Sequence, residues 1–360
     1  MTVTRDDVMA ALRRVVDPAS GRDLVSSDLV RALTVEGGRV RFVLEAADAA
    51  QGARLEPVRA AAVAAVERLT GRGTVQAVVT APAAPKAPPP DLRIGRHPSP
   101  TAGPQPIPGV RHIVPVASGK GGVGKSTVAA NLAVALAGMG LRVGLLDADV
   151  YGPSQPRMMG ISDRPGATPD GKAIVPLRGH GVTVMSIGFM MEEGQAVIWR
   201  GPMLMGALQQ FLGQVQWGEL DILLVDLPPG TGDVQLTLSQ KAPVAGAVVV
   251  STPQDIALLD ARKALDMFGK MNTPILGMIE NMSAYVCPNC GHEAHLFGHG
   301  GAKADAARLG LPFLGEVPLT LATREAGDAG TPVVLARPES LEAAAFRAIA
   351  GKVAKSLGLG

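Results

Sequence analysis

The sequence predicts an α/β protein whose main domain is a doubly wound, mostly parallel sheet. Two observations support this fold. From residue 110 to residue 360, apolar runs of strand length alternate with stretches of helical periodicity. A glycine-rich turn also joins the first of these strands to a helix, as in nucleotide-binding α/β domains. The expected strands are residues 112–117, 143–147, 182–187, 222–226, 247–251 and 275–279, and a turn is expected at 280–283.

A second, smaller α/β domain is expected in residues 1–81, followed by a proline-rich linker in residues 82–109. In the small domain we expect a helix that ends near residue 16, strands at 29–33, 39–44 and 75–79, and a helix at 57–69. A turn at Gly37-Gly38 would join the first two strands. The prolines of the linker favour extended chain over regular structure. The linker therefore separates the small domain from a third segment, residues 110–360, which we expect to be the main domain.

Composition excludes several classes of partner. The formal net charge is only +2 and aromatic residues are 3% of the chain, which disfavours nucleic-acid binding. No apolar run reaches the length of a membrane span, and the first residues lack the apolar core of a secretory leader. We therefore expect a cytoplasmic protein whose partners include no nucleic acid and no membrane.

The glycine-rich turn has the G-x-x-x-x-G-K-[ST] pattern of a phosphate-binding loop. Its residues are Gly119, Lys120, Gly121, Gly122, Val123, Gly124, Lys125 and Ser126, with Thr127 following in the helix. Glycines let backbone N–H groups approach phosphate oxygens, and the helix N-terminus adds partial positive charge. Lys125 is expected to contact the β- and γ-phosphates of ATP, and Ser126 to bind Mg²⁺.

Acidic residues follow two of the expected strands, where Mg-dependent phosphoryl transfer needs them. Asp226 ends an apolar run of Walker B form and is expected to hold Mg²⁺ directly or through water. Asp147 ends the strand at 143–147 and Asp149 lies two residues later, and Asp147 would support the metal or the lysine. Acidic residues after strands also serve as helix caps, which is the simpler interpretation of each.

Cys287 and Cys290 form a C-x-x-C pair and are the only cysteines of the chain. A tetrahedral zinc site or an iron–sulfur cluster usually takes four protein ligands. Either His292, His295 or His299 completes a zinc site, or a second chain supplies two more thiolates. A redox-active pair is a weaker alternative, because the motif does not open a helix near the N-terminus.

The loop form K-G-G-x-G-K-[ST] resembles the deviant Walker A class, which includes MinD, ParA, the nitrogenase iron protein and the Mrp/ApbC carriers. Residues 113–332 are similar to the Mrp/ApbC family of iron–sulfur cluster carrier ATPases. The resemblance is carried by residues 117–127, 145–154 (LLDADVYGPS), 199–203 (WRGPM), 221–240 (with DLPPGTGD), 251–255 (STPQD), 280–283 (ENMS) and 287–291 (CPNCG).

This resemblance implies a homodimer with ATPase activity, in which Lys120 reaches the nucleotide of the partner subunit. It implies that Asp149 orients the attacking water and that Asn281 lies where the adenine is recognised. It further implies a [4Fe–4S] cluster between the Cys287 and Cys290 pairs of two subunits. The cluster would pass to apo iron–sulfur proteins, with cluster scaffold proteins as further partners.

Residues 1–81 resemble the small domain that often precedes these ATPases. Related domains often carry a cysteine before the last helix, and none is present at Gln51-Gly52-Ala53-Arg54. We therefore interpret this domain as a docking or regulatory module. Two alternative functions remain: a MinD/ParA-like positioning ATPase, and a P-loop ATPase with a structural zinc site.

Overall fold

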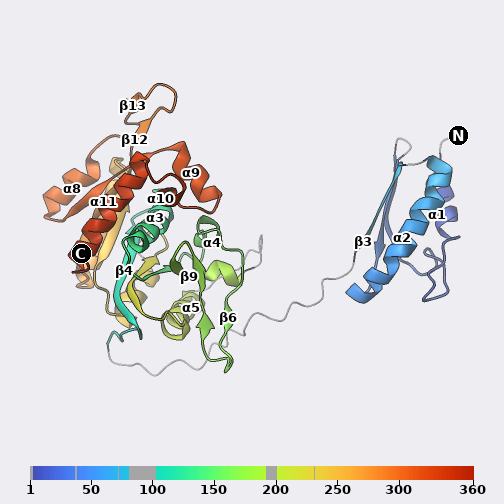
Figure 1. Ribbon diagram of the computed structural model, residues 1–360, viewed down its shortest axis with the longest axis horizontal. Helices are drawn as coiled ribbons and strands as arrows, with labels where there is room; N and C mark the ends of the chain where they lie inside the picture. The colour runs from blue at the N-terminus through green and yellow to red at the C-terminus, as the bar shows by residue number, and fades with distance from the viewer. Residues whose placement is uncertain (1–2, 37–38, 72, 81–102, 192–200, 231) are drawn as a thin grey trace. The chain divides into compact units, whose positions relative to one another are not determined.

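The computed structural model describes residues 3–36, 39–71, 73–80, 103–191, 201–230 and 232–360. The chain divides into two compact units, Met1–Pro89 and Pro90–Gly360 (Figure 1). The expected Gly37-Gly38 turn, most of the proline-rich segment and the first two residues of the WRGPM stretch lie outside the described residues.

The small unit is a three-stranded sheet covered by a long helix. Its elements are α1 (Arg5–Leu12), β1 (Val30–Glu36), β2 (Arg39–Glu45), α2 (Ala49–Thr70) and β3 (Val75–Thr80). The strand order is β1-β2-β3, with β1 antiparallel and β3 parallel to β2. Helix α2 begins eight residues earlier than the expected start at 57, because Asp48 caps it by accepting a hydrogen bond of 2.7 Å from Gln51 N.

The large unit contains a nine-stranded sheet of order β13-β12-β11-β4-β10-β5-β9-β8, and β14 also pairs with β12. The strands are β4 (Val110–Ser118), β5 (Val143–Asp147), β8 (Leu177–Gly179), β9 (Val182–Ser186), β10 (Leu220–Asp226), β11 (Ala247–Ser251), β12 (Ile275–Val286), β13 (Glu293–Ala294) and β14 (Phe313–Leu319). All neighbouring pairs are parallel except those of β8 and β13 at the two ends. A separate ribbon pairs β6 (Gly166–Ala167) with β7 (Ile174–Val175).

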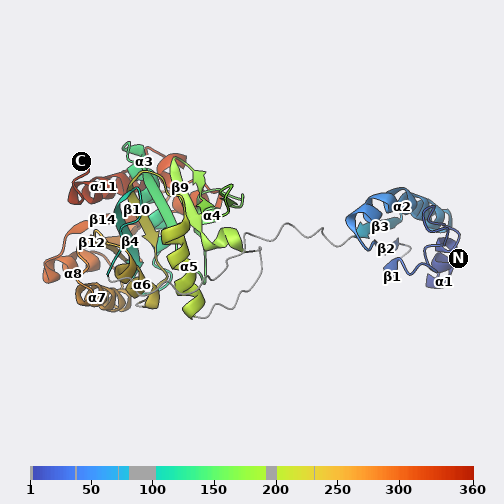
Figure 2. The same cartoon turned by 90° about the horizontal axis from the view of Figure 1, so that it is seen from below.

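Helices cover both faces of this sheet, which confirms the doubly wound fold. Figure 2 shows α3 (Lys125–Gly138) and α11 (Leu341–Ser356) on one face, with α5 (Gly201–Gln214), α6 (Asp233–Lys241), α7 (Asp255–Lys270) and α8 (Gly301–Leu309) on the other. The remaining helices are short: α4 (Gln155–Met158), the 3₁₀ helix η1 (Ile187–Met190), α9 (Leu321–Asp328) and α10 (Val333–Ala336). Every residue of the central strands β5, β9, β10 and β11 is buried, as expected for parallel strands between two helical layers. Within the described part of the chain, no helix combines the length and apolar character that crossing a membrane requires.

The sequence interpretation was wrong at the end of one strand. Residues 280–283 were expected to be a turn, but β12 continues through them to Val286. Pairing with β14 extends the strand, and Glu280 lies opposite Glu316. Met282 has φ +58°, and the register shifts between Asn281 and Tyr285. The turn-like residues therefore form an irregularity inside a strand, whose partner lies more than 30 residues away in the sequence.

Candidate functional site

The predicted phosphate-binding loop joins β4 to the N-terminus of α3, in the context that its pattern requires. Gly122 and Gly124 have φ angles of +81° and +78°, which L side chains rarely adopt. A Cβ on Gly124 would also lie 2.3 Å from Asn281 Nδ2. Gly119 is needed for space, because its Cβ would lie 2.0 Å from the carbonyl carbon of Asp260 in α7.

A buried network connects this loop to the end of β10. The side chain of Lys125 is 6% exposed, and its Nζ forms an ion pair with Asp226 Oδ1. Nζ also lies 3.3 Å from Ser126 Oγ. Gln155, at the start of α4, donates from Nε2 to Asp226 Oδ2 at 2.8 Å and to Ser126 O at 3.0 Å. The structure therefore brings Lys125, Ser126 and Asp226 together.

Asp147 lies at the end of β5, beside Asp226 in the parallel register. It is fully buried and accepts hydrogen bonds from Ser186 Oγ at 3.0 Å and from the backbone N–H groups of Asp149, Ser154 and Gln155 at 3.0–3.1 Å. Burial, together with the Asp226 charge, raises the pKa of Asp147 to about 7 despite these hydrogen bonds. Asp147 thus holds the loop after β5 in place.

Asp149 lies on that loop and is half-buried. Burial raises its pKa, while the nearby Lys125 charge opposes the shift. Its Oδ1 is buried without a hydrogen-bond partner, and so are Ser154 Oγ and Gln155 Oε1. Among the described residues, the only other such side-chain atom is Ser27 Oγ in the small unit. Unpartnered oxygens beside a carboxylate suit a hydrated Mg²⁺, which keeps several waters and uses few protein ligands, so these residues fit that ion.

Asn281 contacts the loop directly. It is 7% exposed on β12 and donates from Nδ2 to Val123 O at 2.8 Å. Lys120 is half-buried, and within the described residues its side chain has no hydrogen bond or ion pair. Thr127 lies in the first turn of α3, where its carbonyl accepts from Asn131 Nδ2 at 2.9 Å. Among the residues that the structure describes, nothing holds the Lys120 amine in place.

A cleft of about 510 Å³ opens beside the network. It lies between the loops that follow β5 and β10 and the helices α5 and α6. Its lining includes Asp149, Tyr151, Met205, Pro229 and Asp233. Tyr151 is 74% exposed, so one wall of this cleft is open to a partner or to solvent.

The cysteine pair lies on the hairpin between β12 and β13, which projects beyond the sheet (Figure 1). Cys287 N donates to His292 O and Gly291 N donates to Cys287 O, both at 2.9 Å. Both thiols are free; Cys287 is half-buried and Cys290 is exposed. Hydrogen bonding from the backbone of Asn289 and from Cys290 lowers the pKa of the Cys287 thiol, which favours a metal-binding thiolate.

The nearby histidines pair with other groups. The rings of His295 and His299 lie 4.4 Å apart. His299 Nε2 is 3.4 Å from Glu316 Oε2, and His295 Nε2 is 3.7 Å from Glu293 Oε1. In the described part of the chain, no group of three or more His, Cys, Asp or Glu side chains is placed to hold a metal ion. The zinc alternative therefore has no third ligand in place among these residues of one chain.

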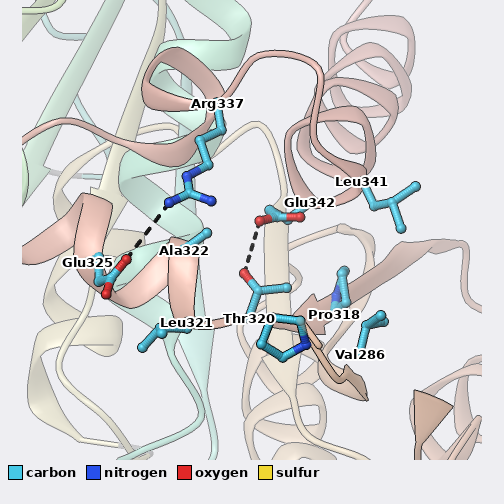
Figure 3. Close-up of a pocket in the computed structure, with 10 residues that line it drawn as sticks. Val286, Pro318, Thr320, Leu321, Ala322, Glu325, Arg337, Leu341 and Glu342 are labelled. Atoms are coloured by element: carbon cyan, nitrogen blue, oxygen red, sulfur yellow. Dashed lines mark hydrogen bonds and ion pairs between the residues drawn. The ribbon is translucent and has the colours of Figure 1, made fainter. Parts of the chain in front are cut away.

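A smaller groove of about 260 Å³ adjoins the cysteine hairpin (Figure 3). Val286 and Pro288, on either side of Cys287, line one wall. Figure 3 shows Arg337 directed at Glu325, 3.8 Å away, and Thr320 Oγ1 donating to Glu342 Oε1 at 3.0 Å. This groove lies next to the Cys pair and apart from the phosphate-binding loop.

Sequence reasoning missed two residues of the buried network, Gln155 and Ser186. Gln155 directly follows residues 145–154, one of the stretches that carry the family resemblance. That position, just after the loop that follows β5, was the signal that could have marked Gln155 as a site residue. Ser186 ends β9, the strand beside β5, and reaches Asp147 only because the two strands are neighbours. No local pattern in the sequence marks that contact.

Comparison with known proteins identifies the family. Residues 109–354 match the family described as the NUBPL iron-transfer P-loop NTPase, of the ParA group. The chain belongs to this family. Residues 5–79 match a second family, described as iron–sulfur cluster assembly protein. The expected kinship with iron–sulfur carrier ATPases is thereby confirmed, and the large unit belongs to a family of nucleotide-binding ATPases.

Two relatives of this iron-transfer family illustrate the similarity. The chain is 45% identical to the iron–sulfur cluster carrier protein of Synechocystis sp., over 98% of this chain and 97% of the relative. It is 54% identical to the mouse iron–sulfur cluster transfer protein NUBPL, over 70% of this chain and 80% of the relative.

Solved structures support the same fold. A nucleotide-binding protein from Archaeoglobus fulgidus, in complex with ADP, has a TM-score of 0.54 and 42% identity, covering 61% of this chain and 87% of that one. The MinD cell division ATPase of Pyrococcus furiosus has a TM-score of 0.52 and 27% identity, covering 68% of this chain and 98% of that one.

Proposed function

We propose that this protein binds and hydrolyses ATP and carries a [4Fe–4S] cluster on a homodimer, for transfer to apo iron–sulfur proteins. The observation that carries the proposal is the Cys287–Cys290 pair, which is free and lies on a projecting hairpin. The chain has no other cysteine. A four-thiolate site therefore requires two copies, each contributing one pair.

The nucleotide site follows from the buried network. The phosphate-binding loop would hold the ATP phosphates with backbone N–H groups, and Lys125 would leave Asp226 to contact the β- and γ-phosphates. Mg²⁺, when bound, neutralises phosphate charge. Ser126 and Asp226 would hold it, the latter directly or through water.

Three further residues have proposed roles. Lys120, whose amine is unpaired within the described residues, would reach the nucleotide of the partner subunit. Asp149 would orient the attacking water from the edge of the 510 Å³ cleft. Asn281 keeps one amide donor on Val123, and the rest of its amide would pair with the adenine edge.

The chain is proposed to have three segments: a docking or regulatory domain at 1–81, a linker at 82–109 and the ATPase domain at 110–360. The first domain would meet scaffold or client proteins in the cytoplasm. Gln51 is used locally, since its Oε1 accepts from Ala47 N at 2.6 Å, and no thiol is present there for a cluster.

The test is metal analysis of the full chain, purified without oxygen and reconstituted with iron and sulfide. About four irons and four sulfides per dimer are expected, with no zinc. The matched control is the Cys287→Ser/Cys290→Ser double variant, which should lose both iron and sulfide. Because both thiols lie outside the buried core, the variant should keep the melting temperature of the wild type.

Stoichiometric zinc without sulfide would refute the carrier proposal and favour a P-loop ATPase with a structural metal site. Iron that persists in the double variant would place the cluster elsewhere. Absence of ATP hydrolysis by the reconstituted dimer would remove the enzymatic part of the proposal.

A further inference from the structure

Gln155 is fully buried in the centre of the network, although the proposed mechanism gives it no role. Its Nε2 donates to two groups that belong to different parts of the site. One is Asp226 Oδ2 at 2.8 Å, at the end of β10, and the other is Ser126 O at 3.0 Å, in the first turn of α3. Gln155 therefore spans the gap between the phosphate-binding helix and the carboxylate.

The partners of Gln155 determine which way its amide faces. Both the Asp226 carboxylate and the Ser126 carbonyl are acceptors, so the NH₂ group must face them. Oε1 then faces away, and it is buried without a partner among the described residues. Rotating the amide by half a turn would not give Oε1 a donor, because Oε1 would then face the two acceptor oxygens of Asp226 and Ser126. A buried carbonyl oxygen in a folded protein ordinarily has a donor, so one is missing here.

In the part of the chain that the structure describes, two other oxygens near Gln155 in the sequence also lack a hydrogen-bond donor. Asp149 Oδ1 and Ser154 Oγ, on the loop that Asp147 anchors, are also buried and unpartnered within the described chain. Within the described residues, three such oxygens on one short segment lack the hydrogen-bond donors that buried oxygens ordinarily have. The waters of a hydrated Mg²⁺ are donors only, and they match this set.

Lys125 and Gln155 share the two oxygens of Asp226. If Lys125 leaves Asp226 for the phosphates of ATP, as proposed above, Oδ1 would be released while Oδ2 would stay bonded to Gln155. The carboxylate would otherwise be free to rotate about its Cβ–Cγ bond. With Gln155 in place, one oxygen stays fixed and the other is open to the metal or to its water.

We propose that Gln155 is a positioning residue for Mg²⁺: its Nε2 fixes Asp226, and its unpartnered Oε1 accepts a hydrogen bond from a metal-bound water. This inference rests on the proposed function, because it assumes that the network binds Mg²⁺ with ATP. The inference adds Gln155 to the proposed Mg²⁺ site, which otherwise consists of Ser126 and Asp226.

The test compares two buried amides in the full chain. Gln155→Met keeps the length and volume of the side chain but removes both hydrogen-bonding groups. Asn131→Leu is the matched control: Asn131 is 3% exposed and donates to Thr127 O at 2.9 Å, one residue from Ser126, but the structure gives it no contact with Asp226. Binding of a fluorescent ATP analogue is measured in EDTA and during titration with Mg²⁺.

Gln155→Met is expected to bind the nucleotide in EDTA as the wild type does. It should need on the order of tenfold more Mg²⁺ for the half-maximal Mg²⁺-dependent change in the fluorescence of the bound analogue, because a hydrogen bond to a charged group is lost. Asn131→Leu should keep the wild-type Mg²⁺ dependence. If Gln155→Met does not fold, Gln155→Asn replaces it, since the shorter amide cannot span Asp226 and Ser126 and the same shift is expected.

An unchanged Mg²⁺ dependence in folded Gln155→Met or Gln155→Asn would overturn the inference and leave the proposed function intact. Equal shifts in the Gln155 and Asn131 variants would also overturn it, because they would show a merely structural role. Failure of the wild type to bind the nucleotide at all would overturn the proposed function and this inference together.

Discussion

The buried carboxylate of Asp147 makes the stability of the nucleotide-free protein depend on pH. Its pKa is raised from 3.8 to about 7 by burial and by Asp226. The folded protein therefore keeps a proton that the unfolded chain has already lost above about pH 5. Because the folded state binds more protons, stability must fall as the pH rises toward and past 7. The perturbation is a change from pH 6 to pH 8, in the wild type and in Asp147→Asn.

The magnitude follows from proton linkage. With a folded pKa of about 7, the site changes from mostly protonated at pH 6 to mostly ionised at pH 8. It holds on average about half a proton over these two pH units, while the unfolded chain holds almost none. At about 1.4 kcal/mol per proton and pH unit, half a proton over two pH units makes the wild type lose on the order of 1 kcal/mol of unfolding free energy from this site. The amide of the Asp147→Asn variant does not titrate, so the variant lacks this loss.

The assay is urea unfolding at both pH values in EDTA, followed by tryptophan fluorescence. Both tryptophans, Trp199 and Trp217, belong to the large unit, and Trp217 is 3% exposed, so the signal reports on that unit. The amide in Asp147→Asn offers one acceptor oxygen where the carboxylate has two, which lowers stability at both pH values and cancels in the comparison. Equal losses in wild type and variant between pH 6 and pH 8 would refute the reasoning, because Asp147 would then not hold a proton in this range.

Two further predictions concern the phosphate-binding loop. Gly124→Ala should lower the unfolding free energy by about 2 kcal/mol and weaken ATP binding, since φ is +78° and the Cβ would meet Asn281. Gly138→Ala, at an exposed helical glycine with open space around it, should raise stability by about 0.5–1 kcal/mol in the same urea assay. A Gly124→Ala variant that is as stable as Gly138→Ala, or more stable, would contradict this. Lys120→Ala and Lys125→Ala should each abolish ATPase activity, but mixing the two should restore about a quarter of it, because mixed dimers contain one complete site. Lack of recovery, with mixed dimers present, would argue against action of Lys120 across the interface.

Much of the site could be predicted because its signals are local. The phosphate-binding loop is a continuous pattern between a strand and a helix, and Asp226 ends an apolar run. The rule that parallel strands end at one edge of the sheet then brings Asp147 and Asp226 together. The expected turn at 280–283 was wrong for the opposite reason, because β14, which extends β12 through it, comes from residues 313–319.

The sequence by itself determined the fold class, the phosphate-binding loop and the presence of one cysteine pair, because each depends on residue type and spacing along the chain. Only the tertiary structure decided that Lys125 forms an ion pair with Asp226, that Ser186 donates a hydrogen bond to Asp147, and that Gln155 donates a hydrogen bond to Asp226 at the end of β10. These contacts join residues 39 to 101 positions apart. Their geometry depends on strand order and burial, which also raise the pKa of Asp147, and no local pattern encodes either.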